Sequence, residues 1–467
     1  MRSIADQLAD ALAEQPASAG PLYRQVAAGV ESLARVGALE YGVQLPSERD
    51  LAERLHVSRN TVKAAYRLLR EKGWLEVRPG AAPRLHHPSR GRQHANAHSA
   101  LWLAEYYREE DHGTDLLCTA PAPAPVVERA LRDPEAMVGP IRLHGTGYSP
   151  EGHPALLDAV AVRLRADGHA AASPERVVVT SGGQHAHALL VGALVSRSRP
   201  IAVEELTFPG IFDAVSRVHA PVIALPMRDG RLDAAAAALV IRAARPALAI
   251  VTTFQHPTGA RLEPDEAAPL VAAAHDAGTV LVENRCAADL ALDGDPPAPL
   301  ASLSEAGPVA TIGSMTKVFW GGLRIGWIHT NLTLAAHLRR RRVALDFGSS
   351  PLQQRLAAAL LAEHFDATVR WRRETLRASV DAVLDELARA APRWAAERPA
   401  GGPGVWVDLG GLDATRFAAR AEAAGLPLAA GELFEAREGA GAGHVRISCQ
   451  DAPERLRGAI RSLASLG

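Results

Sequence analysis

The sequence predicts an α/β protein with a mostly parallel sheet, preceded by a small helical domain. From Leu116 onward, short apolar stretches alternate with Ala-, Leu- and Arg-rich stretches of helical character. This alternation is typical of a parallel sheet with helices on both faces. Residues 1–87 are instead helical in pattern and end in a short β signal, so we expect a separate domain there.

Three regions follow from length and composition. A chain of 467 residues favours two or three domains. Residues 88–113 are polar and rich in histidine, and we expect them to be a linker between residues 1–87 and a larger domain at 114–467.

The N-terminal region begins with one helical stripe and continues with two helix start signals. Ser47 is a good N-cap for a helix that ends near Leu55, and a turn at His56 and Val57 leads to a second N-cap at Ser58. So short a turn between two helices predicts a helix-turn-helix. The stripe consists of Leu22, Val26, Val30 and Leu33.

The second of these helices runs to about Lys72 and is basic along one side. The stretch at 74–85 after it predicts a β-hairpin wing with Pro79 and Gly80 at its tip. A charged, solvated face is the alternative, but the two N-caps and the wing favour DNA binding. The basic residues are Arg59, Lys63, Arg67, Arg70 and Lys72.

The motifs LPSERDLAERL and VSRNTV resemble those of the GntR family of winged helix-turn-helix regulators. The resemblance implies that the start of the second helix reads base edges in a double-stranded DNA operator. The residues that it places at the DNA are Arg49, Ser58, Arg59, Asn60, Thr61, Lys63, Arg78 and Gly80.

In the larger domain, seven apolar stretches are strand candidates. They are VVVT at 177–180, IAVE at 201–204, VIAL at 222–225, LAIVT at 248–252, TVLVE at 279–283, VATI at 309–312 and IGWI at 325–328. The last residues of the chain have apolar positions at helical spacing and predict a closing helix.

One lysine, Lys317, follows the strand candidate at 309–312, between two hydroxyl residues. Burial at a strand end lowers the pKa of a lysine and makes its amine nucleophilic, as in lysines that form Schiff bases with pyridoxal phosphate (PLP). Ser314, Thr316 and Arg324 are then candidates for holding the phosphate. Taken by itself, Lys317 would more often be an ordinary surface lysine.

Four further stretches favour the cofactor site. A glycine loop at 180–187 can cradle a phosphate between a strand and a helix, although such a loop is a weak signal. Phe208 can stack on a flat ring or belong to the core. The turn at 252–262 follows a strand and has a polar residue before its proline. Arg446 can clamp a carboxylate or be an exposed strand arginine.

Together these stretches resemble fold-type-I PLP enzymes of the aspartate aminotransferase superfamily over residues 114–467, with a smaller α+β subdomain. With the N-terminal domain, the chain resembles the MocR subfamily of GntR regulators. The resemblance implies that Lys317 is the catalytic Schiff-base lysine, that Phe208 stacks on the cofactor, and that Arg446 holds a substrate or effector carboxylate. It places Tyr148 at the partner subunit's site in a homodimer. The cofactor-binding residues are Gly183, Gln184, Phe208, His256, Asn284, Ser314, Lys317 and Arg324.

Two positions depart from that family's pattern. His256 stands where the enzymes usually have an asparagine that contacts the phenolic oxygen of the cofactor. Asn284 stands where an aspartate pairs with the pyridine nitrogen. Glu283 cannot take its place, because adjacent strand residues face opposite sides of a sheet.

Three functions remain open from the sequence. The first is a regulator whose aminotransferase-like domain senses PLP, an amine or an amino acid. The second is a working aminotransferase with a DNA-binding module, which the missing aspartate disfavours. The third is a regulator whose second domain is cofactor-free and only dimerises, which Lys317, Arg324 and Arg446 disfavour.

Composition bounds the setting of the protein. A net charge of −1 gives no global attraction to nucleic acid, so a DNA-binding surface must be local. Three cysteines without metal-ligand spacing suit a reducing compartment and predict no metal site. We find neither a signal peptide nor a run of apolar residues long enough to span a bilayer, and we expect a soluble, cytoplasmic protein.

Overall fold

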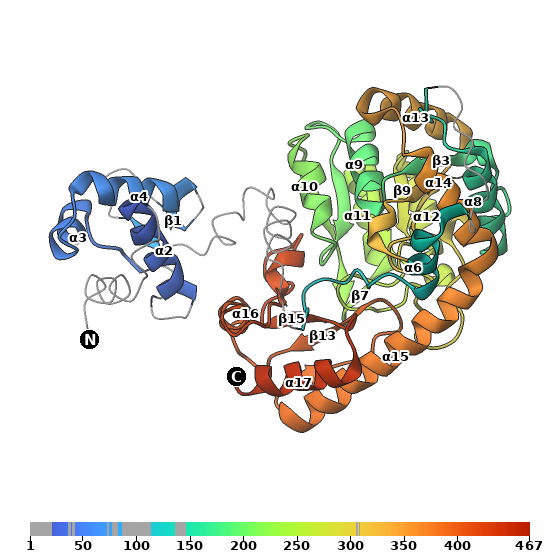
Figure 1. Ribbon diagram of the computed structural model, residues 1–467. Helices are drawn as coiled ribbons and strands as arrows, with labels where there is room; N and C mark the ends of the chain where they lie inside the picture. The colour runs from blue at the N-terminus through green and yellow to red at the C-terminus, as the bar shows by residue number, and fades with distance from the viewer. Residues whose placement is uncertain are drawn as a thin grey trace. The chain divides into compact units, whose positions relative to one another are not determined.

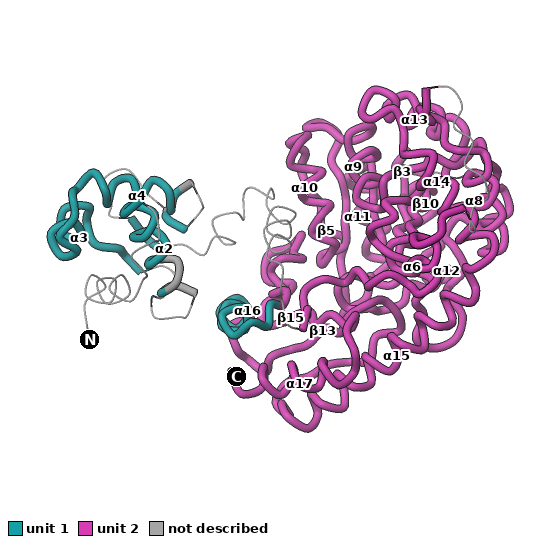
Figure 2. Tube along the Cα trace, in the orientation of Figure 1, with its two compact units in different colours: residues 1–110, 415–427, 466 teal, residues 111–414, 428–465, 467 magenta. Residues whose placement is uncertain are grey.

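The computed structural model describes residues 21–35, 39, 43–71, 74–76, 83–85, 114–135, 146–304, 307 and 309–467. The chain divides into two compact units, one of residues 1–110, 415–427 and 466 and the other of residues 111–414, 428–465 and 467 (Figure 2). The predicted linker at 88–113 lies outside the described residues. Within the described part of the chain, no helix has the length and apolarity needed to cross a membrane.

The N-terminal unit contains the predicted helix-turn-helix. Helix α2 (Leu22–Arg35) carries the apolar stripe, α3 (Glu48–Arg54) begins after the N-cap Ser47, and α4 (Arg59–Glu71) begins after Ser58. The backbone N–H of Asp50 donates to Ser47 Oγ at 3.2 Å, and that of Thr61 donates to Ser58 Oγ at 3.1 Å. Both predicted N-caps are therefore confirmed.

The wing is present as an antiparallel pair of short strands, β1 (Leu75–Glu76) and β2 (Arg84–Leu85). Its predicted tip, including Arg78 and Gly80, lies outside the described residues. A buried apolar cluster joins α2, α3, α4 and the wing, and the Tyr66 hydroxyl donates to Pro46 O at 2.7 Å. This bond fixes the second helix of the motif to the start of the first.

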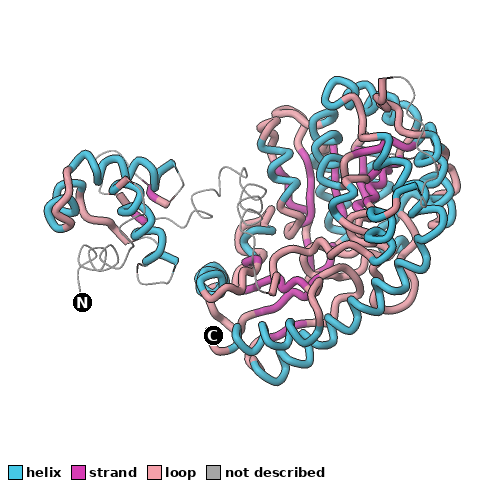
Figure 3. Tube along the Cα trace, viewed as in Figure 1, coloured by secondary structure: helices cyan, strands magenta, loops and turns pink. Residues whose placement is uncertain are grey.

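The larger unit is built on a seven-stranded sheet in the order β3-β11-β10-β9-β8-β4-β5 (Figures 1 and 3). Strand β11 pairs antiparallel with both neighbours, and the other pairings are parallel. The seven strand candidates of the sequence are these strands: four have the predicted bounds, and three have ends shifted by one or two residues. Their bounds are β3 Val177–Thr180, β4 Ile201–Glu204, β5 Val222–Leu225, β8 Leu248–Thr252, β9 Val280–Asn284, β10 Val309–Ser314 and β11 Gly326–His329.

Helices cover both faces of this sheet, as predicted. Alternate strand residues such as Val178 pack against α9 (Gly183–Leu194), α10 (Gly210–Ser216) and α13 (Leu332–Asp346). The intervening strand residues pack on the opposite face against a second set of helices. These are α6 (Pro125–Arg132), α8 (Pro154–Ala166), α11 (Ala234–Ala244), α12 (Pro264–Ala277) and α14 (Pro351–Ala359).

A second, antiparallel sheet with the order β12-β13-β15-β14 forms the predicted smaller subdomain. Its helices include α15 (Phe365–Ala390) and the closing helix α17 (Pro453–Ala464), which buries Leu456, Ile460 and Leu463 as its spacing predicts. The strands are β12 Ala395–Ala396, β13 Gly404–Asp408, β14 Ala429–Ala430 and β15 His444–Ser448. Arg446 therefore lies on an interior strand, between β13 and β14.

Candidate functional site

A cavity of about 220 Å³ lies at the carboxyl ends of β8, β9 and β10 in the larger unit. Parallel α/β sheets bind ligands at this edge. All of the residues predicted to bind a cofactor, together with Arg446, line it: Gly183, Gln184, Phe208, His256, Asn284, Ser314, Lys317, Arg324 and Arg446. Tyr148 is not among the described residues that line the cavity.

One end of the cavity suits an anion. Helix α9 begins at Gly183, and the amides of its first turn have no acceptor within the helix. The Arg324 guanidinium donates to Ser181 O, beside Gly182, whose φ of 86° favours glycine. A Cβ on Gly182 would lie 3.3 Å from that guanidinium, so a side chain here would narrow the cradle.

The hydroxyl residues beside the lysine support each other. Ser314 Oγ donates to Thr316 Oγ1 at 2.9 Å, and the backbone N–H of Thr316 donates to Ser314 Oγ at 3.2 Å. Both residues line the cavity. The two hydroxyl groups are thus held in one orientation at the end of β10, where the sequence predicts contacts with a phosphate.

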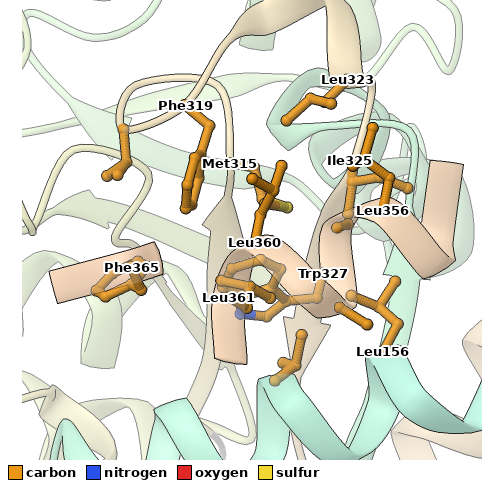
Figure 4. Packing of buried hydrophobic residues seen from close by; sticks show 14 of the residues in the cluster. Leu156, Met315, Phe319, Leu323, Ile325, Trp327, Leu356, Leu360, Leu361 and Phe365 are labelled. Carbon is orange, nitrogen blue, oxygen red and sulfur yellow. The ribbon is translucent and has the colours of Figure 1, made fainter. Parts of the chain in front are cut away.

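Lys317 stands on a loop that the protein core holds in place. Met315, Val318 and Phe319 are each buried on this loop, and Figure 4 shows Met315 and Phe319 packed among other apolar side chains. Lys317 Nζ donates to Thr119 O and to Thr119 Oγ1, both at 2.8 Å. Burial, with a smaller contribution from the Arg446 charge, lowers the pKa of Lys317 to about 8. A useful fraction of the amine is therefore neutral near physiological pH.

The end of β9 presents an amide rather than a carboxylate. Asn284 lines the cavity, while Glu283 is buried elsewhere and accepts hydrogen bonds from the Thr253 hydroxyl, Arg285 and the Leu300 N–H. Asn284 Oδ1 accepts from the backbone N–H of Cys286 at 3.1 Å. The remaining polar group of the Asn284 side chain is its NH₂, which can only donate.

His256 is hydrogen-bonded to Arg446. Its Nε2 accepts from Arg446 at 3.2 Å, and burial together with the charges of Arg446 and Lys317 holds its pKa well below the usual value. The imidazole is therefore neutral, with its proton on Nδ1. Its ring also packs edge-on against Phe208 and Phe434.

Arg446 lines the cavity from strand β15 of the smaller subdomain. It donates to Leu117 O, and its guanidinium stacks over the Phe434 ring at 5.2 Å. Stacking and hydrogen bonding hold the planar group in one orientation, which suits a bidentate contact with a carboxylate.

Among the cavity residues that the sequence analysis did not single out are Thr119, His187 and Cys286. His187 is buried, neither ring nitrogen has a partner among the described residues, and burial lowers its pKa to about 4. It stands four residues after Gly183, on the same side of α9, so helical periodicity could have found it. Thr119 lies 198 residues from Lys317 in sequence, and no local sequence pattern predicts their contact.

The predicted DNA-contacting residues that the structure describes lie on the outside of the N-terminal unit. Arg49, Ser58, Arg59, Asn60 and Lys63 are exposed, and Thr61 is half-buried. The Arg59 side chain is 72% exposed and makes a 3.3 Å ion pair with Glu48. Ser58 bonds both the N–H and the hydroxyl of Thr61, so its role in the fold is to cap α4.

Comparisons with known proteins find both domains. Residues 129–463 match the family described as aminotransferase class I and II, and residues 22–84 match the bacterial regulatory proteins of the gntR family. The chain is 26% identical to the "Uncharacterized HTH-type transcriptional regulator YisV" of Bacillus subtilis, covering 83% of this chain and 84% of that protein. It is 28% identical to the "Probable rhizopine catabolism regulatory protein MocR" of Rhizobium meliloti, covering 79% and 77%.

Solved structures support the fold of the larger unit. The α-aminoadipate aminotransferase LysN of Thermus thermophilus, complexed with N-(5'-phosphopyridoxyl)-L-leucine, matches with a TM-score of 0.66 and 25% identity. The match covers 75% of this chain and 91% of that chain.

Lys317 is expected to react with small carbonyl compounds at lower pH than an ordinary lysine. Only the neutral amine is nucleophilic, and burial lowers the pKa of Lys317 to about 8, so its reactivity should rise as the pH increases through that value. Reductive methylation followed by peptide mapping measures this. Labelling of Lys317 should be half-maximal near pH 8, whereas Nα-acetyl-lysine in the same tube should follow its pKa of about 10.4. Labelling of Lys317 that parallels acetyl-lysine would contradict the assignment.

Proposed function

The chain belongs to the aminotransferase class I and II family and is a transcription regulator with a GntR-type DNA-binding domain, and we propose that its aminotransferase-like domain binds PLP through Lys317 and responds to an amine or amino-acid effector. The observation that carries the proposal is one cavity that is lined by a half-buried lysine, an anion cradle and an arginine suited to a carboxylate. We place its action in the cytoplasm, where DNA is accessible.

The chemistry of the cavity fits PLP. A phosphate matches the first-turn amides of α9, the Arg324 guanidinium and the hydroxyl groups of Ser314 and Thr316. The half-buried Phe208 offers an aromatic face for the ring. The Lys317 amine, with its pKa lowered to about 8, is suited to bond the aldehyde carbon of the cofactor.

PLP, when bound, supplies an aldehyde that captures amines and a ring that accepts electrons from a substrate carbanion. Electron acceptance requires a protonated pyridine nitrogen, which a carboxylate stabilises and an NH₂ donor does not. Asn284 presents its NH₂, because its Oδ1 accepts from Cys286. At contact distance and an effective dielectric near 20, the attraction between a carboxylate and the pyridinium, which Asn284 cannot supply, is about 4 kcal/mol before the cost of desolvation is counted. We therefore propose that the domain binds PLP but transaminates poorly.

The effector site is at Arg446. Its guanidinium is held by stacking on Phe434 and by contacts with Leu117 and His256. Lys317 lines the same cavity, and the Arg446 charge acts on it, so the amine of a molecule whose carboxylate binds here can reach toward Lys317. We therefore propose an amino acid or a related amine with a carboxylate as the effector class.

Two alternative functions are each disfavoured by a different observation. A domain that is cofactor-free and only dimerises does not need a buried lysine with an anion cradle beside it. A working aminotransferase would use a carboxylate at the position of Asn284, and the nearest carboxylate in sequence, Glu283, is engaged by Thr253, Arg285 and Leu300 outside the cavity. The regulator that binds PLP accounts for both features.

DNA binding is assigned to the N-terminal unit. The exposed residues at the start of α4 are suited to base edges, and the remaining exposed basic residues are suited to phosphates. The wing residues Arg78 and Gly80 remain part of this proposal as predicted contacts.

We also propose a homodimer of the larger domain. Tyr148 is 69% exposed and Phe347 is 56% exposed, and their rings lie 5.3 Å apart outside the cavity. Exposed aromatic pairs of this kind are typical of association surfaces. In a two-fold dimer Tyr148 would reach toward the partner's cavity, as the sequence predicts, and the operator would contain paired half-sites.

Replacing Arg59 with alanine should weaken operator binding by about 1–3 kcal/mol, because the side chain is positioned to read a base. Gel-shift titration on the DNA upstream of the protein's own gene measures the change across a salt series. Arg132→Ala, which removes an exposed arginine from α6 of the larger unit, is the matched control. Equal affinities for the two variants would exclude Arg59 from the interface.

Asn284→Asp should tighten PLP binding by roughly tenfold or more, since even half of the attraction forgone, about 2 kcal/mol, exceeds a factor of ten. Absorbance titration with PLP measures affinity, and rapid mixing with amino acids measures the formation of pyridoxamine phosphate. The parent should form little of it and the variant more. Asn331→Asp, at the N-cap of α13, is the control. Ordinary enzyme rates in the parent, or no gain in the variant, would contradict the role of Asn284.

Sedimentation at micromolar concentration should give twice the chain mass of 49.4 kDa. Phe347→Ser should weaken association, because it removes apolar area from the proposed interface. Leu239→Ser changes a comparably exposed residue on α11 and should not. A parent protein that sediments as a monomer would refute the dimer.

A further inference from the structure

The first described residues of the larger unit run along the cavity. Residues 115–122, here called the tether segment, follow the residues that join this unit to the DNA-binding domain in sequence. Thr119 of the tether segment lines the cavity itself. The first described part of the larger unit therefore contributes to the wall of the ligand site.

The two functional cations of the cavity both hold this segment. Lys317 Nζ donates to the carbonyl and to the hydroxyl of Thr119, each at 2.8 Å. Arg446 donates to Leu117 O. The groups assigned to the cofactor aldehyde and to the effector carboxylate are thus the same groups that bind the tether segment.

Other contacts of the tether segment do not involve those cations. The Ser448 N–H donates to Leu116 O at 2.9 Å, and its hydroxyl donates to Cys118 O. At the far end, Arg372 donates to Ala122 O at 3.0 Å and to Val318 O at 3.2 Å on the lysine loop. Leu116, Cys118 and Ala122 are therefore held independently of any ligand, and a ligand at Lys317 or Arg446 acts on Thr119 and Leu117 between these anchors.

Ligand chemistry competes directly with these contacts. When the neutral Lys317 amine condenses with an aldehyde, a C=N bond replaces the C=O bond, and the oxygen leaves as water with the two amine hydrogens. The nitrogen then carries one hydrogen at most, so it cannot donate to both acceptors of Thr119. A carboxylate that accepts two hydrogen bonds from Arg446 likewise competes with Leu117 O.

The sequence makes the segment stiff. Prolines alternate with alanines at Pro121, Pro123 and Pro125, and each proline fixes its own φ and restricts the residue before it. A displacement at Thr119 is therefore poorly absorbed by bending between residues 120 and 125.

We propose that the tether segment couples the cavity to the DNA-binding domain: bonding of Lys317 to PLP, or of Arg446 to an effector carboxylate, removes the contacts of these cations with Thr119 and Leu117, loosens the segment there and thereby changes operator affinity. The proposal rests on the proposed function, because it assumes PLP at Lys317 and DNA at α4. It adds the physical link between the two sites.

Hydrogen exchange on the full chain tests this loosening. In the parent, PLP should accelerate exchange in a peptide that covers residues 115–122 by roughly fivefold, the effect of one net hydrogen bond. Lys317→Ala should show the same acceleration without PLP and no further change with it. Thr119→Val, a milder variant that keeps the carbonyl, should show part of it. Thr368→Val, which removes a buried hydroxyl bonded to His364 O on α15, is the matched control and should show none.

Operator titrations of the same proteins complete the test. Addition of PLP to the parent should shift operator affinity. The substitutions Lys317→Ala and Thr119→Val, without PLP, should shift it in the same direction relative to the parent, and Thr368→Val should not. The coupling is wrong under the following result. The parent gains the visible absorbance of bound PLP and binds operator, but PLP does not change its exchange at 115–122, and Thr119→Val has the same operator affinity as the control Thr368→Val. Absence of visible absorbance or of operator binding in the parent would instead refute the proposed function, and the exchange of Lys317→Ala without PLP would still decide whether Lys317 holds the segment.

Discussion

Lys317 carries an amine into a cavity where water solvates its charge poorly, and two acceptors on Thr119 replace part of that solvation. This balance sets the properties of the site. Burial lowers the pKa of the amine to about 8, which makes it a nucleophile. The apolar packing of Met315, Val318 and Phe319 keeps the lysine loop from moving toward solvent. The anion cradle, the arginine and the tether segment are all arranged around this one group.

The surroundings of the amine distinguish capture of a ligand from catalysis. The groups proposed to bind a phosphate, around Gly183 and Arg324, line the cavity, whereas the polar group at the end of β9 is the amide of Asn284. His256 is neutral and serves Arg446. A site with strong attachment and a weak electron sink is suited to a protein that must hold a ligand long enough to signal. The contacts of Lys317 and Arg446 with residues 117–119 supply a route by which holding a ligand changes the chain beyond the cavity.

Much of this organisation could be predicted from the sequence, because it depends on local patterns. Apolar runs identified the strands of the central sheet, and N-caps at Ser47 and Ser58 identified the helix-turn-helix. Polar residues that directly follow strands, such as Asn284, could be placed together because parallel strands share one edge. Thr119 could not be placed, since its contact with Lys317 joins residues far apart in sequence and depends on tertiary packing. The pairing of His256 with Arg446 was missed for the same reason.

The central claim is that one cavity controls the DNA-binding domain through the chemistry of Lys317. The most direct measurement follows visible absorbance and the anisotropy of a labelled operator in a single titration of the full chain with PLP, at a fixed operator concentration near its midpoint. The account predicts that anisotropy changes in proportion to absorbance, and that Lys317→Ala loses both responses. An absorbance that saturates while operator anisotropy stays constant would contradict it.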